Sequence, residues 1–106
     1  MLSEQDRRSA REFNERVKKV ARVLDLRVFG SRARGEAEPD ADMDVFVELE
    51  TYTPELRQRI SEIAWEVGFE MDRIITTVVT ARYELGHGAM GANPLYLNVE
   101  KEGVRP

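Results

Sequence analysis

Asp42 and Asp44 are the residues of this 106-residue chain whose type and spacing first indicate chemistry. In an extended strand, side chains alternate between the two faces, so both carboxylates project on one face while Val45 and Val47 project on the other. Two neighbouring carboxylates repel each other unless a cation lies between them, and a hard divalent cation such as Mg²⁺ prefers oxygen ligands. The pair therefore predicts a metal site at the start of a strand whose other face is buried.

A second polar feature, Gly30-Ser31, follows the apolar pair Val28-Phe29 and precedes the two aspartates. A glycine at the end of a strand leaves backbone N–H groups open to close approach by a phosphate. Arg32 and Arg34 follow directly and carry charges that could neutralise an anion. A phosphate-binding turn placed before a carboxylate pair predicts a site for Mg²⁺ and a nucleoside triphosphate.

Other motif interpretations of the same segment fit less well. The spacing of Gly30 and Gly35 matches the first half of a P-loop, but Glu36 stands where that motif needs a lysine. The series Asp40-x-Asp42-x-Asp44 opens like a calcium loop, but Val45 replaces the required glycine. A solvated acidic turn is an adequate account of the first of these aspartates. It is a poor account of the other two, because a phosphate-type turn precedes them.

The segment 28–49 resembles the signature of the polymerase-beta-like nucleotidyltransferases, which is a Gly-Ser pair, ten intervening residues and an Asp-x-Asp pair. The short chain is similar to their minimal form, the MNT proteins. Pro39 fits the pattern, whereas Ala41 stands where Ser or Asp often precedes the first aspartate. The resemblance implies that Asp42 and Asp44 are catalytic metal ligands. It also implies that Gly30-Ser31 and Arg32 hold the β- and γ-phosphates of ATP while pyrophosphate leaves.

Nucleotidyltransferases commonly use a third carboxylate on a later strand, and Asp72 is the natural candidate here. It is expected to open the third strand in phase with Ile74 and Thr76, where it would be a third catalytic and metal-binding residue. The alternative is that Asp72 is only a polar residue at a strand end, and Glu70 is a weaker substitute. One Mg²⁺ ion is expected from the aspartate pair, and a second ion depends on Asp72. His87, the only histidine, is given no role.

Hydrophobic spacing, capping residues and turn residues predict the elements that position these groups. The sequence predicts a helix over 4–24 capped by Ser3, a strand over 26–29, a helical turn over 31–34, a strand over 43–49, a helix from Pro54 to about Val67, a strand over 71–80 and a helix from Pro94 to about Lys101. Gly68 is expected to end the middle helix, and Trp65 is expected in the core rather than on a partner surface. The expected fold is α+β, a single nucleotidyltransferase domain over residues 1–106 with a small mixed sheet of about three strands packed against helices.

Composition limits the function classes. The chain has a formal net charge of −4 and no cysteine, which excludes disulfides and thiolate metal sites. Residues 1–35 hold ten Lys/Arg and five Asp/Glu, whereas residues 36–106 hold six and fifteen, so a basic side and an acidic side are expected. The overall acidity argues against strong nucleic-acid binding. No apolar stretch approaches membrane-spanning length, and the lack of cysteine fits a reducing cytoplasm.

A chain of this length has little room to enclose an acceptor, so the acceptor is expected on another protein. MNT proteins that it resembles are commonly paired with HEPN-type RNase toxins, and some transfer AMP to a toxin tyrosine. The resemblance therefore implies an antitoxin that transfers AMP from ATP to a hydroxyl of a helical, HEPN-type partner protein, within a homo- or hetero-oligomer. Two alternatives stay open: a non-catalytic antitoxin that acts by binding alone, and a catalytic subunit that modifies a small molecule held by a separate subunit.

Overall fold

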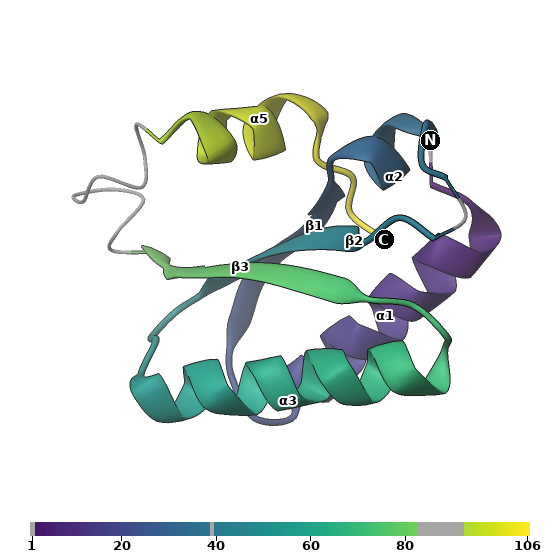
Figure 1. Ribbon diagram of the computed structural model, residues 1–106. Coiled ribbons are helices and arrows are strands. Elements are labelled where there is room, and N and C mark those ends of the chain that lie inside the picture. The colour runs from purple at the N-terminus through teal and green to yellow at the C-terminus, as the bar shows by residue number, and fades with distance from the viewer. Residues whose placement is uncertain (1, 39, 83–92) are drawn as a thin grey trace.

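The computed structural model describes residues 2–38, 40–82 and 93–106, so Pro39 and His87 lie outside the described residues. It shows a three-stranded mixed sheet with helices on both faces, which confirms the expected α+β fold (Figure 1). The described elements are α1 (Glu4–Lys18), β1 (Val23–Phe29), α2 (Ser31–Arg34), β2 (Met43–Leu49), α3 (Pro54–Glu70), β3 (Ile75–Ala81) and α5 (Pro94–Glu102).

The strand order β1-β2-β3 brings three chain segments together at one end of the sheet. β1 is antiparallel to β2, and β3 is parallel to β2. In this register Phe29 pairs with Asp44, and Asp44 pairs with Thr76. The end of β1, the start of β2 and the start of β3 therefore meet where the sequence predicts the metal site.

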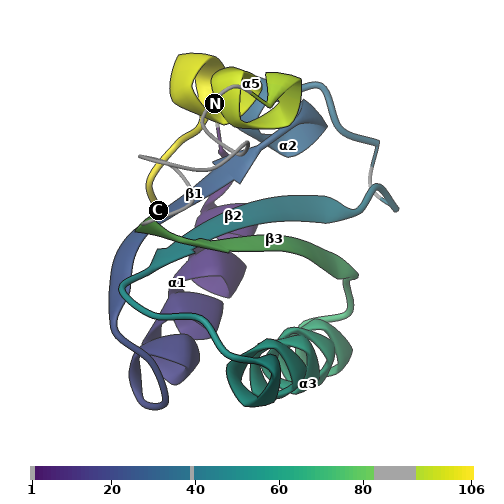
Figure 2. The ribbon, with the colours of Figure 1, turned by 90° about the vertical axis from the view of Figure 1, so that its left-hand side faces the viewer.

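Two helix layers enclose the sheet, with α1 and α3 on one face and α5 on the other (Figure 2). Side chains alternate along β2, so Val45 and Val47 belong to the main core beneath α1 and α3. Phe46 points the other way and packs with Val99 of α5. Among the residues that the structure describes, no helix has the length and apolar character needed to cross a membrane.

The first helix is shorter than the sequence predicts. The Ser3 cap is confirmed, because its hydroxyl accepts a hydrogen bond from the Asp6 N–H at 3.0 Å. However, α1 ends at Lys18, and β1 begins at Val23 rather than at residue 26. Val20, which lies within the range predicted to be an amphipathic helix, is 40% exposed. Pairing with β2 thus overrides the helical spacing of the apolar residues that follow Lys18.

The connection between α3 and β3 also differs from the prediction. α3 continues past Gly68, and β3 begins only at Ile75. A Cβ at Gly68 would lie 2.4 Å from the carbonyl oxygen of Arg73, so the turn after the helix packs directly against this glycine. Asp72 lies in that turn with φ of +55°. The prediction that Asp72 opens a strand is therefore wrong.

Trp65 does not lie in the core, contrary to the prediction. It is 70% exposed and stacks on Phe69, which is 76% exposed, with ring centroids 5.5 Å apart. The buried stripe of α3 is filled instead by Ile60, Ile63 and Val67. The two aromatic rings therefore form an apolar surface beside the sheet.

Candidate functional site

The turn at Gly30 lies directly against Asp44. Gly30 has φ of +77°, and a Cβ built on it would lie 2.6 Å from Asp44 Oδ2. A side chain at this position would therefore clash with the carboxylate and would also strain the backbone. Ser31 begins the four-residue helix α2 immediately after Gly30. The structure thus brings the expected phosphate-binding turn into contact with the expected metal ligand.

The two aspartates at the start of β2 act on each other. Burial and, second, the charge of Asp42 raise the pKa of Asp44 above its ordinary value. Asp42 is exposed, and its Oδ2 accepts a hydrogen bond of 3.4 Å from the Thr76 hydroxyl. Neither aspartate forms an ion pair with any residue in the described ranges. Two adjacent carboxylates without a cationic side chain are a suitable donor set for a hard divalent cation.

Asp72 is not brought together with this pair. It is exposed and lines a surface hollow together with Asp40 and Phe69, and neither Asp42 nor Asp44 lines that hollow. Within residues 2–38, 40–82 and 93–106, no group of three or more His, Asp or Glu side chains could hold a metal ion. The β3 residue that pairs with Asp44 is Thr76, whose hydroxyl contacts Asp42. The sequence pointed to Thr76 in one way only, because it was expected on the same strand face as Asp72.

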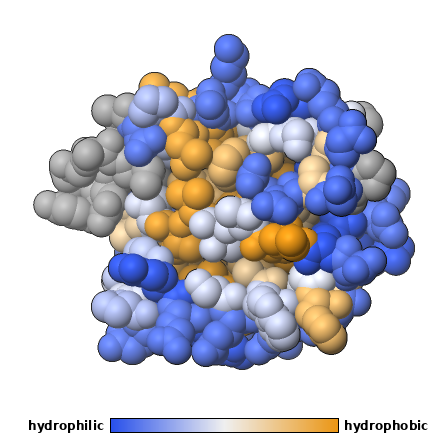
Figure 3. All heavy atoms as spheres, viewed as in Figure 1, coloured by the Kyte–Doolittle hydropathy of each residue, from blue (hydrophilic) through white to orange (hydrophobic). Residues whose placement is uncertain are grey.

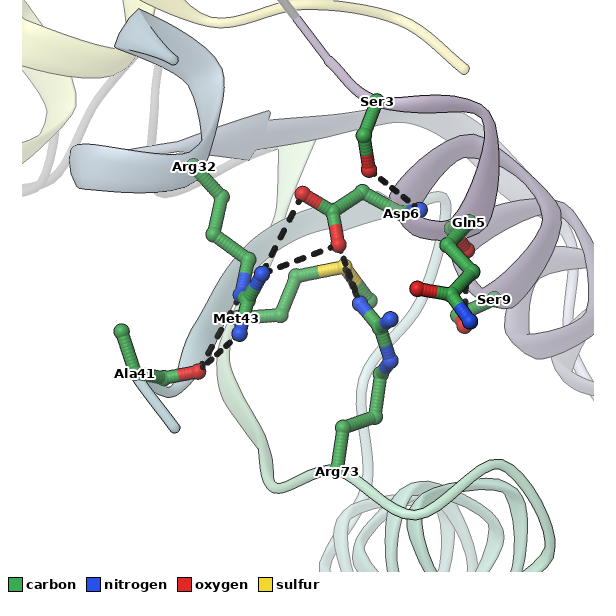
Figure 4. Close-up of polar contacts among 8 residues, drawn as sticks. All are labelled: Ser3, Gln5, Asp6, Ser9, Arg32, Ala41, Met43 and Arg73. Atoms are coloured by element: carbon green, nitrogen blue, oxygen red, sulfur yellow. Dashed lines mark hydrogen bonds and ion pairs between the residues drawn. The ribbon is translucent and has the colours of Figure 1, made fainter. Parts of the chain in front are cut away.

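Arg32 lies in a buried polar cluster rather than on the surface (Figure 4). Its Nη1 donates to both carboxylate oxygens of Asp6, at 3.1 and 3.4 Å. Its Nη2 and Nε donate to the carbonyl oxygen of Ala41, at 2.6 and 3.1 Å. Arg73 reaches the same Asp6 carboxylate from the turn before β3. These contacts favour a structural role for Arg32, which fixes the residue directly before Asp42.

A sequence model of the nucleotidyltransferase domain family matches residues 8–87, which is more than half of the chain and includes the whole candidate site. The chain belongs to the nucleotidyltransferase domain family. A search of curated proteins gave no match.

Two solved structures are similar to this nucleotidyltransferase domain. One, described as a minimal nucleotidyltransferase, is similar over 98% of this chain and 99% of its own, with 26% identity and a TM-score of 0.61. The other is a crystal structure of a toxin–antitoxin with AMP-PNP, similar over 88% of this chain and 68% of its own, with 16% identity and a TM-score of 0.59. At that lower identity the likeness concerns the fold.

The arrangement has two features that are suited to nucleotidyl transfer. A backbone turn that excludes side chains can approach phosphate oxygens, and adjacent carboxylates can hold a divalent cation beside them. Such catalysis depends mainly on positioning and charge neutralisation, with little covalent chemistry from the protein. The sheet register and the Arg32 cluster supply that positioning.

Proposed function

We propose that this nucleotidyltransferase domain binds ATP with Mg²⁺ and transfers AMP to a hydroxyl group of a partner protein. The observation that carries the proposal is the contact between the Gly30 turn and Asp44, where a Cβ would lie 2.6 Å from the carboxylate oxygen. Asp42 and Asp44 would hold the metal, and the backbone of Gly30-Ser31 would face the β- and γ-phosphates. The expected role of Arg32 in phosphate binding stays a prediction, and Asp6 competes for its guanidinium.

The reaction is an in-line displacement at the α-phosphorus. The acceptor oxygen forms a bond to this phosphorus, the bond to the β-phosphate oxygen breaks, and pyrophosphate leaves with its electron pair. Bound Mg²⁺ would neutralise phosphate charge and polarise the phosphorus–oxygen bond. The acceptor hydroxyl loses its proton to solvent or to a base on the partner, because β3 presents Thr76 rather than a carboxylate opposite Asp44.

A protein acceptor is favoured by three considerations. The chain has 106 residues, and most of its apolar side chains are used to cover the two faces of one sheet. The toxin–antitoxin structure with AMP-PNP has a similar fold. The sequence signature resembles MNT antitoxins that are paired with HEPN-type RNase toxins. A HEPN-type toxin in the cytoplasm is therefore the proposed partner.

A second candidate is an antitoxin that neutralises its partner by contact alone. The observation in its favour is the position of Asp72, which lies in an exposed turn apart from Asp42 and Asp44. A two-metal site would need a third carboxylate from elsewhere. The aspartate pair and the Gly30 turn would be unnecessary for a protein that only binds.

Transfer of label from α-³²P-ATP to the co-expressed partner protein distinguishes the two candidates. The parent chain should label the partner and raise its mass by one or more AMP units, only when Mg²⁺ is present. The variants Asp42→Asn and Asp44→Asn should still bind the partner but should not label it. If both variants neutralise the partner as well as the parent chain does, and no label appears with any of the three proteins, binding alone is the function.

A further inference from the structure

In the part of the chain that the structure describes, the outer edge of β3 is unpaired. β3 is the last strand in the order β1-β2-β3, and no other described strand pairs with its outer side. The Met43 N–H donates to the Ile74 carbonyl at 2.8 Å, so the backbone groups of the alternate residues Thr77 and Val79 point away from β2. The strand Ile75–Ala81 contains no proline and no charged residue. Within its seven residues it therefore lacks the proline and the charged side chains that often protect an edge strand from pairing.

An apolar hollow lies beside this edge, on the α3 side of the sheet. Its volume is about 300 Å³, and its lining includes Trp65, Phe69, Ile75 and Thr77. Ile74, at the rim, is 63% exposed. Figure 3 shows apolar residues gathered in the middle of this face, around β3 and toward α5, with polar residues along α3. A protein surface that exposes a stacked aromatic pair beside an unpaired strand is typical of a binding site.

The hollow continues into an acidic one. The second hollow, of about 550 Å³, shares Phe69 and Ile74 with the first and adds Asp40 and Asp72. Neither of these two aspartates forms an ion pair with a residue that the structure describes. Arg73 lines both hollows and Arg32 lines the second, but both guanidinium groups are paired with Asp6. The two hollows therefore form one groove that is apolar at one end and negatively charged at the other.

We propose that this groove binds an extended segment of a partner protein, which adds to β3 as a further strand. The segment would place an apolar side chain against Trp65 and Phe69 and a Lys or Arg side chain between Asp40 and Asp72. A second copy of this chain fits less well, because the strand Ile75–Ala81 that it would add contains no Lys or Arg to place between Asp40 and Asp72, and each copy has a net charge of −4. Charge complementarity thus selects a partner with a basic and apolar strand.

The same docking mode deepens the proposed function, on which this step rests, because it brings an acceptor to the site. Thr76 and Val78 face the same side of the sheet as Asp44, whereas Ile75 and Thr77 face the groove. Along an added strand, successive side chains would therefore alternate, with one entering the groove and the next facing the site. Neighbouring strands lie about 4.8 Å apart, so a residue beside Thr76 would be roughly 10 Å from Asp44 across the sheet. A long hydroxyl side chain such as tyrosine would cover part of that distance, toward a nucleotide bound at Asp44.

A library of random 12-residue peptides displayed on phage tests the docking site directly. Selection on the immobilised full chain, without ATP or Mg²⁺, should enrich peptides in which β-branched or aromatic residues alternate with others and which contain Lys or Arg. Fluorescence anisotropy with the enriched peptides should show binding about tenfold or more weaker for Phe69→Ala. Asp72→Asn should also weaken binding and reduce its dependence on salt.

Backbone pairing is tested by Thr77→Pro, with Thr77→Val as the matched control. The Thr77 N–H points away from β2, so proline removes no bond of the β2–β3 ladder but blocks an added strand. The peptide should bind the valine variant normally and the proline variant at least about tenfold more weakly. Hydrogen exchange on the parent chain is the second measurement, because the Thr77 and Val79 amides should become protected when peptide is added.

The docking proposal is overturned if the library yields no enriched peptide, if enriched peptides bind Thr77→Pro as tightly as the parent, or if the two amides stay unprotected. A stable dimer that Thr77→Pro dissociates would make a second copy the occupant and would also overturn it. Peptide binding needs neither nucleotide nor metal. If no peptide binds but AMP transfer occurs, only the docking site is refuted. If peptides bind but no AMP transfer occurs, only the proposed function is refuted.

Discussion

Replacing Asp6 by Asn should destabilise the protein strongly, because one buried carboxylate holds two buried guanidinium groups. The side chain of Asp6 is 6% exposed, and those of Arg32 and Arg73 are each 9% exposed. Asparagine keeps the shape of the side chain and leaves the Ser3 cap intact, because the cap uses the Asp6 backbone N–H. The substitution therefore removes a charge and little else, and it leaves two like charges facing each other without a counterion.

The size of the effect follows from that burial. Removing one partner of a buried ion pair costs about 3–5 kcal/mol, because the remaining charge stays buried without compensation. This is a large share of the roughly 5–15 kcal/mol that stabilises a typical domain. For a domain of about this size, 1 kcal/mol corresponds to roughly 4–8 °C in Tm, so the variant should melt at least about 10 °C below the parent.

Thermal unfolding followed by circular dichroism, with urea unfolding as a second assay, measures this difference. Glu70→Gln is the matched control, because Glu70 forms a 2.6 Å ion pair with Arg16 but lies on the surface. The control should change Tm little, since exposed ion pairs are screened by solvent. Below its Tm, Asp6→Asn should also bind Mg²⁺ more weakly, because Arg32 then holds the Ala41 carbonyl less firmly. A Tm for Asp6→Asn within the range of the Glu70→Gln control would refute this account of the cluster.

Three further predictions concern the site. Asp44→Asn should raise Tm at neutral pH in the absence of metal. The pKa of the Asp44 carboxyl is raised in the folded state, so its contribution to stability falls as pH rises through the aspartate range, and the ionised carboxylate opposes folding. An unchanged or lower Tm would contradict this. Mg²⁺ affinity, measured by calorimetry across a pH series, should begin to fall at a higher pH than for an ordinary aspartate, because protons compete for Asp44, and a flat profile contradicts this. Gly30→Ala should destabilise the fold by about 1–3 kcal/mol in urea unfolding, because only glycine tolerates φ of +77° with ψ of −155°. The added methyl group should also weaken Mg²⁺ binding by pushing on the Asp44 carboxylate. A free energy of unfolding equal to that of the parent chain would contradict this.

The sequence was sufficient to predict the parts of the site that depend on local pattern. Strand alternation placed Asp42 and Asp44 correctly at the start of β2, and the glycine that precedes Ser31 was identified as a position needing an open backbone. The structure added the reason for that glycine, which is its contact with Asp44. This contact depends on the pairing of Phe29 in β1 with Asp44 in β2.

The parts that were not predicted depend on contacts between distant segments. The residues next to Arg32 in the sequence indicate only a cation beside a turn, but its ion-pair partner Asp6 lies 26 residues earlier. Asp72 was placed on a strand because apolar and β-branched residues follow it, whereas the turn after α3 is fixed by packing against Gly68. Trp65 was expected in the core rather than on a partner surface, but smaller residues of α3 already cover the sheet surface under this helix.

The central claim is that Gly30, Asp42 and Asp44 form a metal-dependent nucleotide site, and calorimetry with ATP tests it most directly. The parent chain should bind ATP in the presence of Mg²⁺ and should lose most of that affinity in EDTA. The double variant Asp42→Asn/Asp44→Asn should keep its fold by circular dichroism and show no difference between Mg²⁺ and EDTA. Equal ATP binding by the parent and the double variant, with or without a divalent ion, would contradict the claim.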